Sequence, residues 1–256
     1  DGDGPGALST TRHGQYGGAR AEWVSADGQW RSREYDAATL LETRRPPIGK
    51  AALRDMAAAS QRVTLVWKRG GRHERPWVIV APSAVLRGTE ATGGDAGMGL
   101  YVWKNFARDE MIGRYTGDGM GRFEADDEDG KSAAILKLPE GKRDKVLELE
   151  RDDGRVELID ATGAGAPYVE RANDARGLRD AAGERRRHTA FMDGHGVLRS
   201  LRRGPGKHGQ GQRWTTITVE GGWEELAGRE VLWPYGEAYW KAVAKEHGAE
   251  RKKVAA

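Results

Sequence analysis

The chain has 256 residues, enough for one large domain or for one domain with an appendage. It carries 42 basic and 39 acidic residues, for a net charge of +3, so charge alone does not make it a strong polyanion binder. It contains no cysteine, which excludes disulfides, thiolate zinc sites and a cysteine nucleophile. This composition fits an intracellular protein, nuclear or cytoplasmic. No apolar run approaches the roughly 20 residues that cross a bilayer, so we expect no membrane partner.

The N-terminal third divides into a glycine-rich start and a structured flank. Residues 1–20 lack periodic apolar positions and are predicted to be disordered. Residues 21–85 are expected to flank the main domain. Two helices are predicted in this flank, at Asp36–Glu42 and Lys50–Ala59.

Strand signals follow in several short pieces. Strands are predicted at 62–68 (RVTLVWK), 76–82 (PWVIVAP), 133–138 and 145–150, with an acidic loop at 121–131. A further apolar piece, VELID, follows a glycine turn. Many short strands with uneven spacing and few long helices indicate an α+β fold that is mainly β.

Several familiar motifs fail at a required position. The sequence RRGPGKHG lacks both the first glycine and the Ser/Thr of a phosphate-binding loop, because Leu201 and His208 stand there. The acidic run misses the calcium-loop pattern, since Ala125 and Leu136 occupy ligand positions. No histidine pair has zinc-protease spacing and no G-x-S-x-G elbow exists, so no metal site is predicted.

Three separated segments carry the strongest signal. The first is GMGLY at 97–101 with ARDEMIGRYTGD after it, the second is LID at 158–160 with RANDARG after a glycine turn, and the third is GREVLWPYG at 228–236. In order and spacing they resemble the SET methyltransferase family, whose patterns include G-x-G with a later Y-x-G, "ID … N-x-A-R-F-I-N-H-S", and "G-E-E-L-x-x-D-Y-G". The resemblance covers roughly residues 86–240.

The resemblance implies a fold, a cofactor and a reaction. The fold would be a SET-like β-clip of several short sheets with a few flanking helices. It would span 86–240, with a basic loop insertion at 185–213 and a helical tail at 241–256. The reaction would transfer a methyl group from S-adenosyl-L-methionine to a lysine side chain of a protein, a histone or another. No metal would be needed.

The resemblance also assigns residues to the site. Glycines 97 and 99 would let the backbone approach the cofactor closely. Asn173 matches the family's asparagine, whose amide can both donate and accept toward the cofactor. The full set implied for the cofactor is Gly97, Met98, Gly99, Leu100, Trp103, Asn173 and Asp174. The lysine channel would be lined by Tyr235, at the methyl-transfer centre, together with Tyr115 and Tyr101.

Two departures from the family pattern leave other functions open. Asp174 stands where the family has histidine, and Pro234 replaces the aspartate before Tyr235. The alternatives are a catalytically silent SET-like module that binds a peptide or nucleic acid, and a β-rich nucleic-acid-binding domain without a cofactor. The segment 185–213, with eight Arg/Lys against one Asp, is the candidate for weak contact with nucleic acid.

Overall fold

A computed structural model gives the structure of the chain. It describes residues 22–24, 28, 30–68, 76–85, 97–103, 105–115, 117–139, 146–160, 168–176, 178, 185–201, 214 and 217–235. The segments predicted as a disordered start, 1–20, and as a helical tail, 241–256, lie outside these residues.

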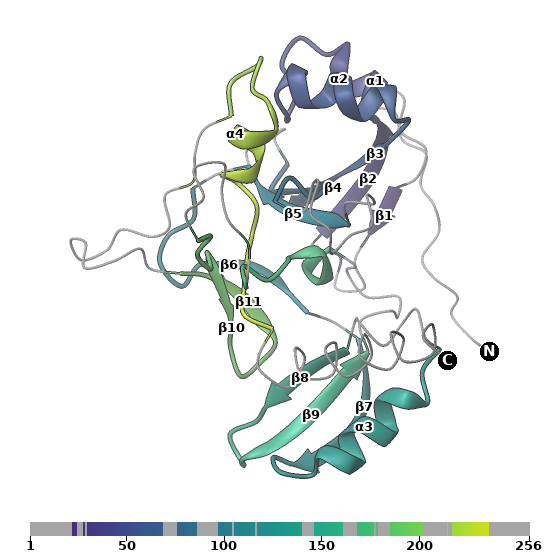
Figure 1. Cartoon of the computed structure of the whole chain (residues 1–256), viewed down its shortest axis with the longest axis vertical. Helices are drawn as coiled ribbons and strands as arrows, with labels where there is room; N and C mark the ends of the chain where they lie inside the picture. The colour runs from purple at the N-terminus through teal and green to yellow at the C-terminus, as the bar shows by residue number, and fades with distance from the viewer. Residues whose placement is uncertain are drawn as a thin grey trace, which may run out of the picture.

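The described fold is mainly β, with three antiparallel sheets (Figure 1). The strand order is β1-β2-β3-β4-β5 in the first sheet, β10-β11-β6 in the second and β7-β9-β8 in the third. The strands are β1 (Glu22–Val24), β2 (Trp30–Asp36), β3 (Arg62–Lys68), β4 (Val78–Pro82), β5 (Met98–Val102), β6 (Met111–Arg114), β7 (Asp118–Glu124), β8 (Val146–Glu150), β9 (Arg155–Asp160), β10 (Ala190–Met192) and β11 (Val197–Ser200). The helices are α1 (Ala37–Leu41), α2 (Lys50–Ala58), α3 (Glu128–Leu136), α4 (Trp223–Ala227) and the 3-10 helix η3 (Val169–Arg171).

The first sheet, β1 to β5, separates two hydrophobic cores. Successive side chains of a strand point to opposite faces. Leu65, Ile79 and Tyr101 accordingly pack with helices α1 and α2 on one face, while Val80 and Leu100 pack into the larger core on the other. Burial on both faces explains why β4 is apolar at every position.

The flank and the main domain share this sheet. Strand β4 pairs with β5 along its length, from Val78 opposite Val102 to Pro82 opposite Met98. The residues on either side of the predicted boundary at 85/86 are therefore joined by backbone hydrogen bonds. The predicted helices near 36–42 and 50–59 and the predicted strands near 62–68 and 76–82 are confirmed as α1, α2, β3 and β4.

The third sheet, β7 to β9, is covered by helix α3. The predictions of an acidic loop at 121–131 and a strand at 133–138 are wrong here, because β7 continues to Glu124 and α3 follows. Asp127 begins the helix by accepting a hydrogen bond from the Gly130 N–H at 2.8 Å. Two acidic residues in the first turn also favour the helix N-terminus. The strands predicted at 145–150 and in VELID are confirmed as β8 and β9.

The second sheet contains part of the segment that was predicted to be a basic loop. Residues 190–192 and 197–200 form the β10–β11 hairpin, so the prediction of a loop is wrong for them. Asp193 holds the turn by accepting hydrogen bonds from the backbone N–H groups of His195 and Val197, both at 2.9 Å. Gly196 has φ +72, a conformation that favours glycine. Residues 202–213 lie outside the described part of the chain.

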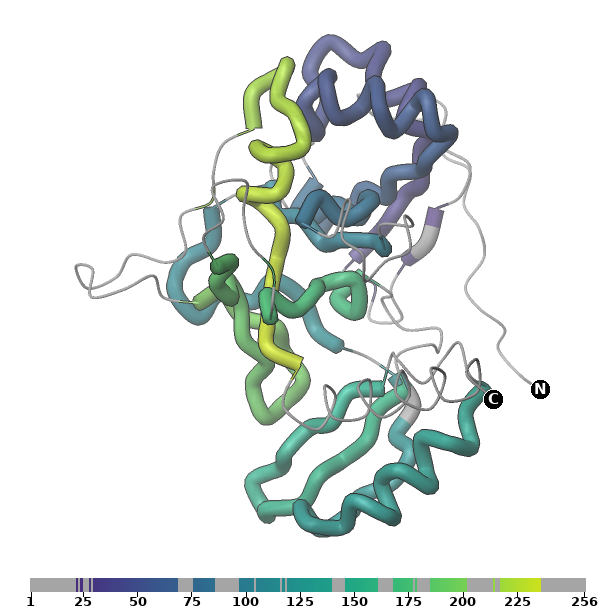
Figure 2. The backbone as a smooth tube through the Cα atoms, viewed as in Figure 1, coloured from purple at the N-terminus to yellow at the C-terminus, as the bar shows by residue number. Residues whose placement is uncertain are grey.

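The last described segment connects the layers of the molecule. In Figure 2 it runs from α4, on the side of α1 and α2, down past the middle of the fold toward the second sheet. This segment, residues 228–235, is the third of the three motif segments. Its neighbours define the candidate site.

Candidate functional site

The three motif segments lie side by side. Tyr101 in β5 forms an isolated antiparallel bridge with Glu230, and Asn173 forms a parallel bridge with Leu232. The backbone N–H of Val231 donates to the Leu100 carbonyl at 2.7 Å, and that of Trp233 donates to the Asn173 carbonyl at 2.8 Å. Residues 228–235 are therefore hydrogen-bonded to β5 on one side and to the RANDARG segment on the other.

A buried carboxylate, that of Glu230, joins these segments. Its Oε1 accepts from the Ser83 hydroxyl at 2.7 Å and from the Asn173 side-chain amide at 2.8 Å. Its Oε2 accepts from the backbone N–H groups of Ala84 at 3.0 Å and Val85 at 3.1 Å. A buried charged group requires such partners, so Glu230 fixes the positions of the groups around it.

Burial sets the electrostatics of this cluster. Glu230 is 1% exposed, and burial raises its pKa more than its hydrogen-bond donors lower it. Burial also raises the pKa of Tyr101 well above its usual value, and the neighbouring Glu230 charge adds to the effect. Beside them, burial lowers the pKa of Arg229 to about 10. The cluster thus places ionisable groups in a medium from which water is excluded.

Tyr101 lies in the protein core. It is 0% exposed. Its hydroxyl oxygen accepts from the Ala84 N–H at 2.7 Å. Its single hydroxyl proton faces two acceptors, the Pro82 carbonyl at 2.7 Å and Glu230 Oε2 at 3.2 Å. Its ring belongs to the core beneath α1 and α2, whereas Tyr235 packs against the core on the opposite face of the sheet. Contrary to the prediction, Tyr101 therefore does not share a surface with Tyr235.

Tyr115 follows β6 and is placed differently. It is 8% exposed, and it belongs to the same hydrophobic cluster against which Tyr235 packs. Its backbone N–H donates to the Gly196 carbonyl at 2.7 Å, which fixes it beside the β10–β11 hairpin. Of the three tyrosines predicted to line the channel, Tyr115 and Tyr235 thus share one cluster.

Asn173 presents one end of its amide inward. The two hydrogens on Nδ2 are used by the Met98 carbonyl at 3.2 Å and by Glu230 Oε1 at 2.8 Å. An amide nitrogen has two hydrogens, so both are committed. No described residue donates to Oδ1, and the side chain is half-buried. Asn173 can therefore offer an acceptor to a ligand, rather than the donor and acceptor that the resemblance implied.

The two glycines of the first motif have different surroundings. A Cβ on Gly99 would lie 2.6 Å from Glu230 Oε1, whereas a Cβ on Gly97 would have no atom within 4 Å. The protein itself thus excludes a side chain at Gly99, because the buried carboxylate occupies that space. Only Gly97, which is exposed, leaves open space that a ligand could use.

The other predicted cofactor residues are placed as follows. Leu100 is fully buried, and its carbonyl is already paired with the 228–235 segment. Met98 and Trp103 are half-buried at opposite ends of the β5 region. Met98 is the one in contact with Asn173, through its carbonyl.

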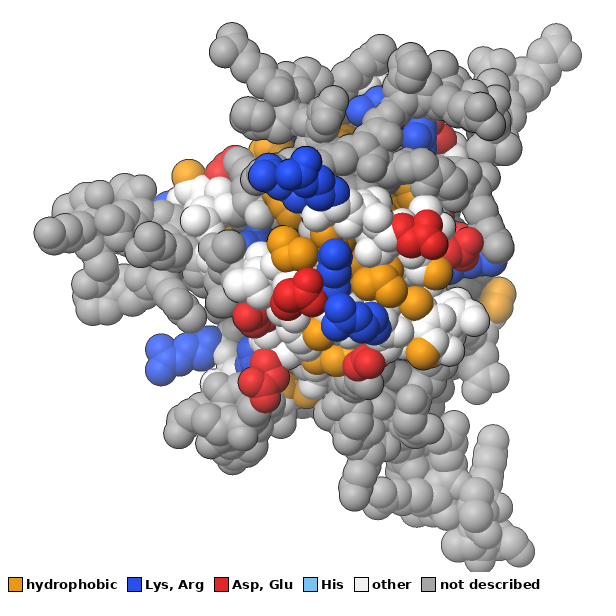
Figure 3. All heavy atoms as spheres, turned by 90° about the horizontal axis from the view of Figure 1, so that it is seen from above, with side chains coloured by type: hydrophobic (Ala, Val, Ile, Leu, Met, Phe, Trp, Pro, Cys, Tyr) orange, Lys and Arg blue, Asp and Glu red, His pale blue; other side chains and the backbone are white. Residues whose placement is uncertain are grey.

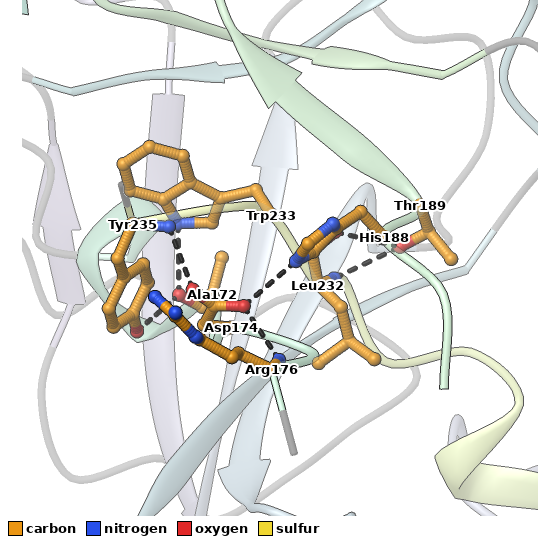
Figure 4. A network of polar contacts seen from close by, with 8 residues as sticks. All are labelled: Ala172, Asp174, Arg176, His188, Thr189, Leu232, Trp233 and Tyr235. Atoms are coloured by element: carbon orange, nitrogen blue, oxygen red, sulfur yellow. Dashed lines mark hydrogen bonds and ion pairs between the residues drawn. The ribbon is translucent and has the colours of Figure 1, made fainter. Parts of the chain in front are cut away.

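Tyr235 is held at three points (Figure 4). Its hydroxyl donates to the Ala172 carbonyl at 2.8 Å, and its backbone N–H donates to Asp174 Oδ2 at 2.9 Å. Its ring centroid lies 5.2 Å from that of Trp233, with the rings tilted by 57°. The Trp233 indole N–H donates to the same Ala172 carbonyl at 3.1 Å. This segment therefore presents an aromatic pair of fixed orientation.

Asp174, where the family pattern has histidine, is a buried carboxylate. Its side chain is 4% exposed, and Oδ1 contacts His188 Nε2 at 2.8 Å and accepts from the Arg176 N–H at 2.7 Å. His188 comes from the stretch before β10, so an imidazole reaches this position from a different part of the chain. In Figure 4 the Arg176 side chain extends toward Tyr235.

The residues that sequence reasoning missed are Glu230 and His188. Glu230 lies within the third motif, but nothing in the sequence shows that Gly99 and Asn173 pack around it. His188 lies fourteen positions after Asp174. No helical or strand periodicity in the sequence indicates that these two side chains meet. Only the long-range pairing of the segments reveals either role.

The basic segment offers limited charge to a polyanion. Arg185 and Arg187 are exposed, but Arg199 is bound to Asp193 at 2.6 Å and to the Asp109 carbonyl at 3.0 Å. On the described part of the face in Figure 3, basic side chains are interspersed with acidic ones. Arg202 and Arg203, in the same segment, lie outside the described residues.

Other classes of site find no support in the described ranges. No three His, Asp or Glu side chains come together there as metal ligands. None of the described helices is long and apolar enough to cross a bilayer.

No protein-family model matches the chain, and a search of curated proteins found no match. Function must therefore be inferred from the residues and their geometry.

Proposed function

We propose that the chain is an S-adenosylmethionine-dependent methyltransferase that acts on a lysine side chain of a protein. The observation that carries this proposal is the meeting of the three motif segments around Asn173. Its amide contacts Met98 and Glu230, and its carbonyl contacts the segment that carries Tyr235. Asn173 lies 75 positions after Met98 and 57 positions before Glu230 in the sequence. These contacts therefore bring together the three segments on which the SET resemblance rests.

The residues present fit the proposed cofactor at two points. The Asn173 Oδ1 is an acceptor suited to the ammonium group of the methionine part, and Gly97 leaves open space beside Met98. When bound, S-adenosylmethionine supplies an electrophilic methyl group on a positively charged sulfur. A lysine amine must be neutral to attack it, although the reference pKa of lysine is about 10.4.

The chain's own groups would favour that neutral amine. The half-buried Tyr235 ring packs against the buried Trp233, and an amine placed beside this apolar pair would be partly desolvated, which disfavours an ammonium ion. The Ala172 carbonyl already accepts from both rings, so their orientation is fixed before a substrate arrives. Such preorganisation aligns the reacting groups, an effect that can be worth about 7–11 kcal/mol. The lysine proton would be lost to solvent before attack, and the N–CH3 bond would form as the S–CH3 bond breaks, with a neutral thioether as the leaving group. This reaction needs no metal.

A second function, a SET-like module without catalysis that binds a peptide or nucleic acid, is favoured by two observations. The Tyr235 hydroxyl donates its only proton to the Ala172 carbonyl, and Asp174 replaces the family's histidine. With this function Tyr235 would have a packing role, and the accessible part of its ring would bind a side chain without modifying it.

One experiment separates the two functions. The purified chain is incubated with S-adenosylmethionine carrying a labelled methyl group and a broad panel of lysine-bearing proteins, histones among them. The methyltransferase predicts label on lysine, which Asn173→Ala lowers at subsaturating cofactor. Binding of S-adenosylmethionine without label on any panel protein supports the silent module instead.

A further inference from the structure

We propose that His188 and Asp174 act as a positioning pair for Tyr235, an inference that rests on the proposed function for its catalytic consequence. The pair joins three parts of the chain: the stretch before β10, the RANDARG segment and the end of the 228–235 segment (Figure 4). Neither residue needs to touch the substrate or the cofactor. Their effect would pass through one backbone hydrogen bond.

The direction of the hydrogen bonds follows from the atoms involved. A carboxylate only accepts, so His188 Nε2, at 2.8 Å from Asp174 Oδ1, must carry a proton. The other oxygen of the same carboxylate accepts the Tyr235 N–H at 2.9 Å. The two contacts use different oxygens, so holding one oxygen fixes the direction in which the other points.

Burial strengthens the dependence of Asp174 on its hydrogen-bond donors. The Asp174 side chain is 4% exposed while that of His188 is 35% exposed, so the imidazole is the solvent-facing member of the pair. A buried carboxylate that loses a donor is under-compensated and seeks other partners. Without His188, Oδ1 of Asp174 would keep the Arg176 N–H at 2.7 Å but lose its imidazole donor, so the carboxylate would be held less firmly and its hydrogen bond with the Tyr235 N–H would weaken.

A direct test measures amide hydrogen exchange at Tyr235, whose N–H is the group in question. In His188→Ala we expect this amide to exchange at least about tenfold faster, because its acceptor is held less firmly. The Trp233 amide, bonded to the Asn173 carbonyl, should stay unchanged. His188→Gln, which keeps an N–H donor near the position of Nε2, should restore slow exchange. His195→Ala, at an exposed histidine in the β10–β11 turn, is the matched control and should alter neither amide.

Two results would overturn the inference: an unchanged Tyr235 amide in His188→Ala, or equal acceleration of the Trp233 amide, which would mean general loosening. Because His188 is one-third exposed, its replacement should leave the chain folded.

The kinetic consequence is tested separately. His188→Ala should lower kcat by roughly tenfold while the KM for S-adenosylmethionine changes by less than about twofold, and His188→Gln should recover most of the activity. If the exchange results appear but the wild type transfers no methyl group, the positioning pair stands and the proposed function fails. If methyl transfer occurs but kcat does not change in His188→Ala, the catalytic effect of the positioning pair is refuted while the proposed function stands.

Discussion

The side-chain amide of Asn173 donates to Glu230 Oε1 at 2.8 Å across 57 positions of sequence. Through this contact the second and third motif segments share a buried carboxylate with the loop after β4, at Ser83, Ala84 and Val85. A carboxylate with this many donors is a structural centre as well as part of the candidate site. Substitutions at and around Glu230 separate those two roles.

Replacing the carboxylate should cost stability. Glu230→Gln puts an NH2 group where Oε2 accepts two backbone N–H groups, so at least one buried donor loses its acceptor. Leaving a buried polar group unpaired costs about 1–3 kcal/mol, and we expect a free energy of unfolding lower by at least that amount. Chemical denaturation measures it. The control is Glu224→Gln in α4, an exposed position where the change should lie within about 0.5 kcal/mol.

The two glycines of the first motif should respond in opposite ways. Gly99→Ala places a methyl group 2.6 Å from Glu230 Oε1 and should destabilise the fold by about 1–3 kcal/mol, as overpacking does. Gly97→Ala meets no atom within 4 Å, so it should leave the melting temperature nearly unchanged. It should weaken S-adenosylmethionine binding if the open space is used by the cofactor. Equal loss of stability in both variants would contradict the placement of Glu230 beside Gly99.

The free energy of unfolding should depend on pH through the carboxylate of Asp193 in the β10–β11 turn. Partial burial raises the pKa of Asp193, but the hydrogen bonds from Arg199 and from the Val197 and His195 N–H groups outweigh it, so the pKa is lowered. A lowered carboxyl pKa contributes stability that is fully present above the unfolded value of about 3.9 and is lost as the pH falls through the folded value. The difference in free energy of unfolding between wild type and Asp193→Asn should therefore be constant near neutral pH and shrink below about pH 4. A difference that does not vary with pH would mean that the ionised carboxylate of Asp193 does not stabilise the fold.

Tyr235→Phe separates chemistry from stability. The variant keeps the ring contact with Trp233 but loses the hydroxyl donor to the Ala172 carbonyl. We expect a loss of stability of about 0.5–1.5 kcal/mol, the usual value of one hydrogen bond. Methyl transfer should fall at least about tenfold, which is about 1.4 kcal/mol of barrier. Unchanged turnover, measured with labelled S-adenosylmethionine, would remove Tyr235 from the reaction.

The sequence predicted the elements whose pattern is local. The apolar residues of 62–68 marked β3, and the helices near 36–42 and 50–59 formed where expected. It failed at 133–138, where the apolar run AAILKL suggested a strand although Ala, Leu and Lys favour a helix, and the Asp127 cap starts a helix upstream. It also treated 190–200 as loop, although β10 and β11 form a short local hairpin there and β11 is extended into a sheet by the distant β6.

The candidate site was predictable as a set of segments, although the way its residues interact was not. The motifs named Gly99, Asn173 and Tyr235, and the structure links their segments. The sequence could not show that Glu230 lies between Gly99 and Asn173, nor that Tyr101 faces the opposite core. Both depend on which face of β5 each side chain takes once β5 pairs with β4.

The most direct test of the proposed function is titration calorimetry of the intact chain with S-adenosylmethionine. The proposal predicts saturable binding to one site, a melting temperature that rises with cofactor concentration, and an affinity weakened by about 1–3 kcal/mol in Asn173→Ala. The absence of heat, with a melting temperature that does not move at millimolar S-adenosylmethionine, would contradict it.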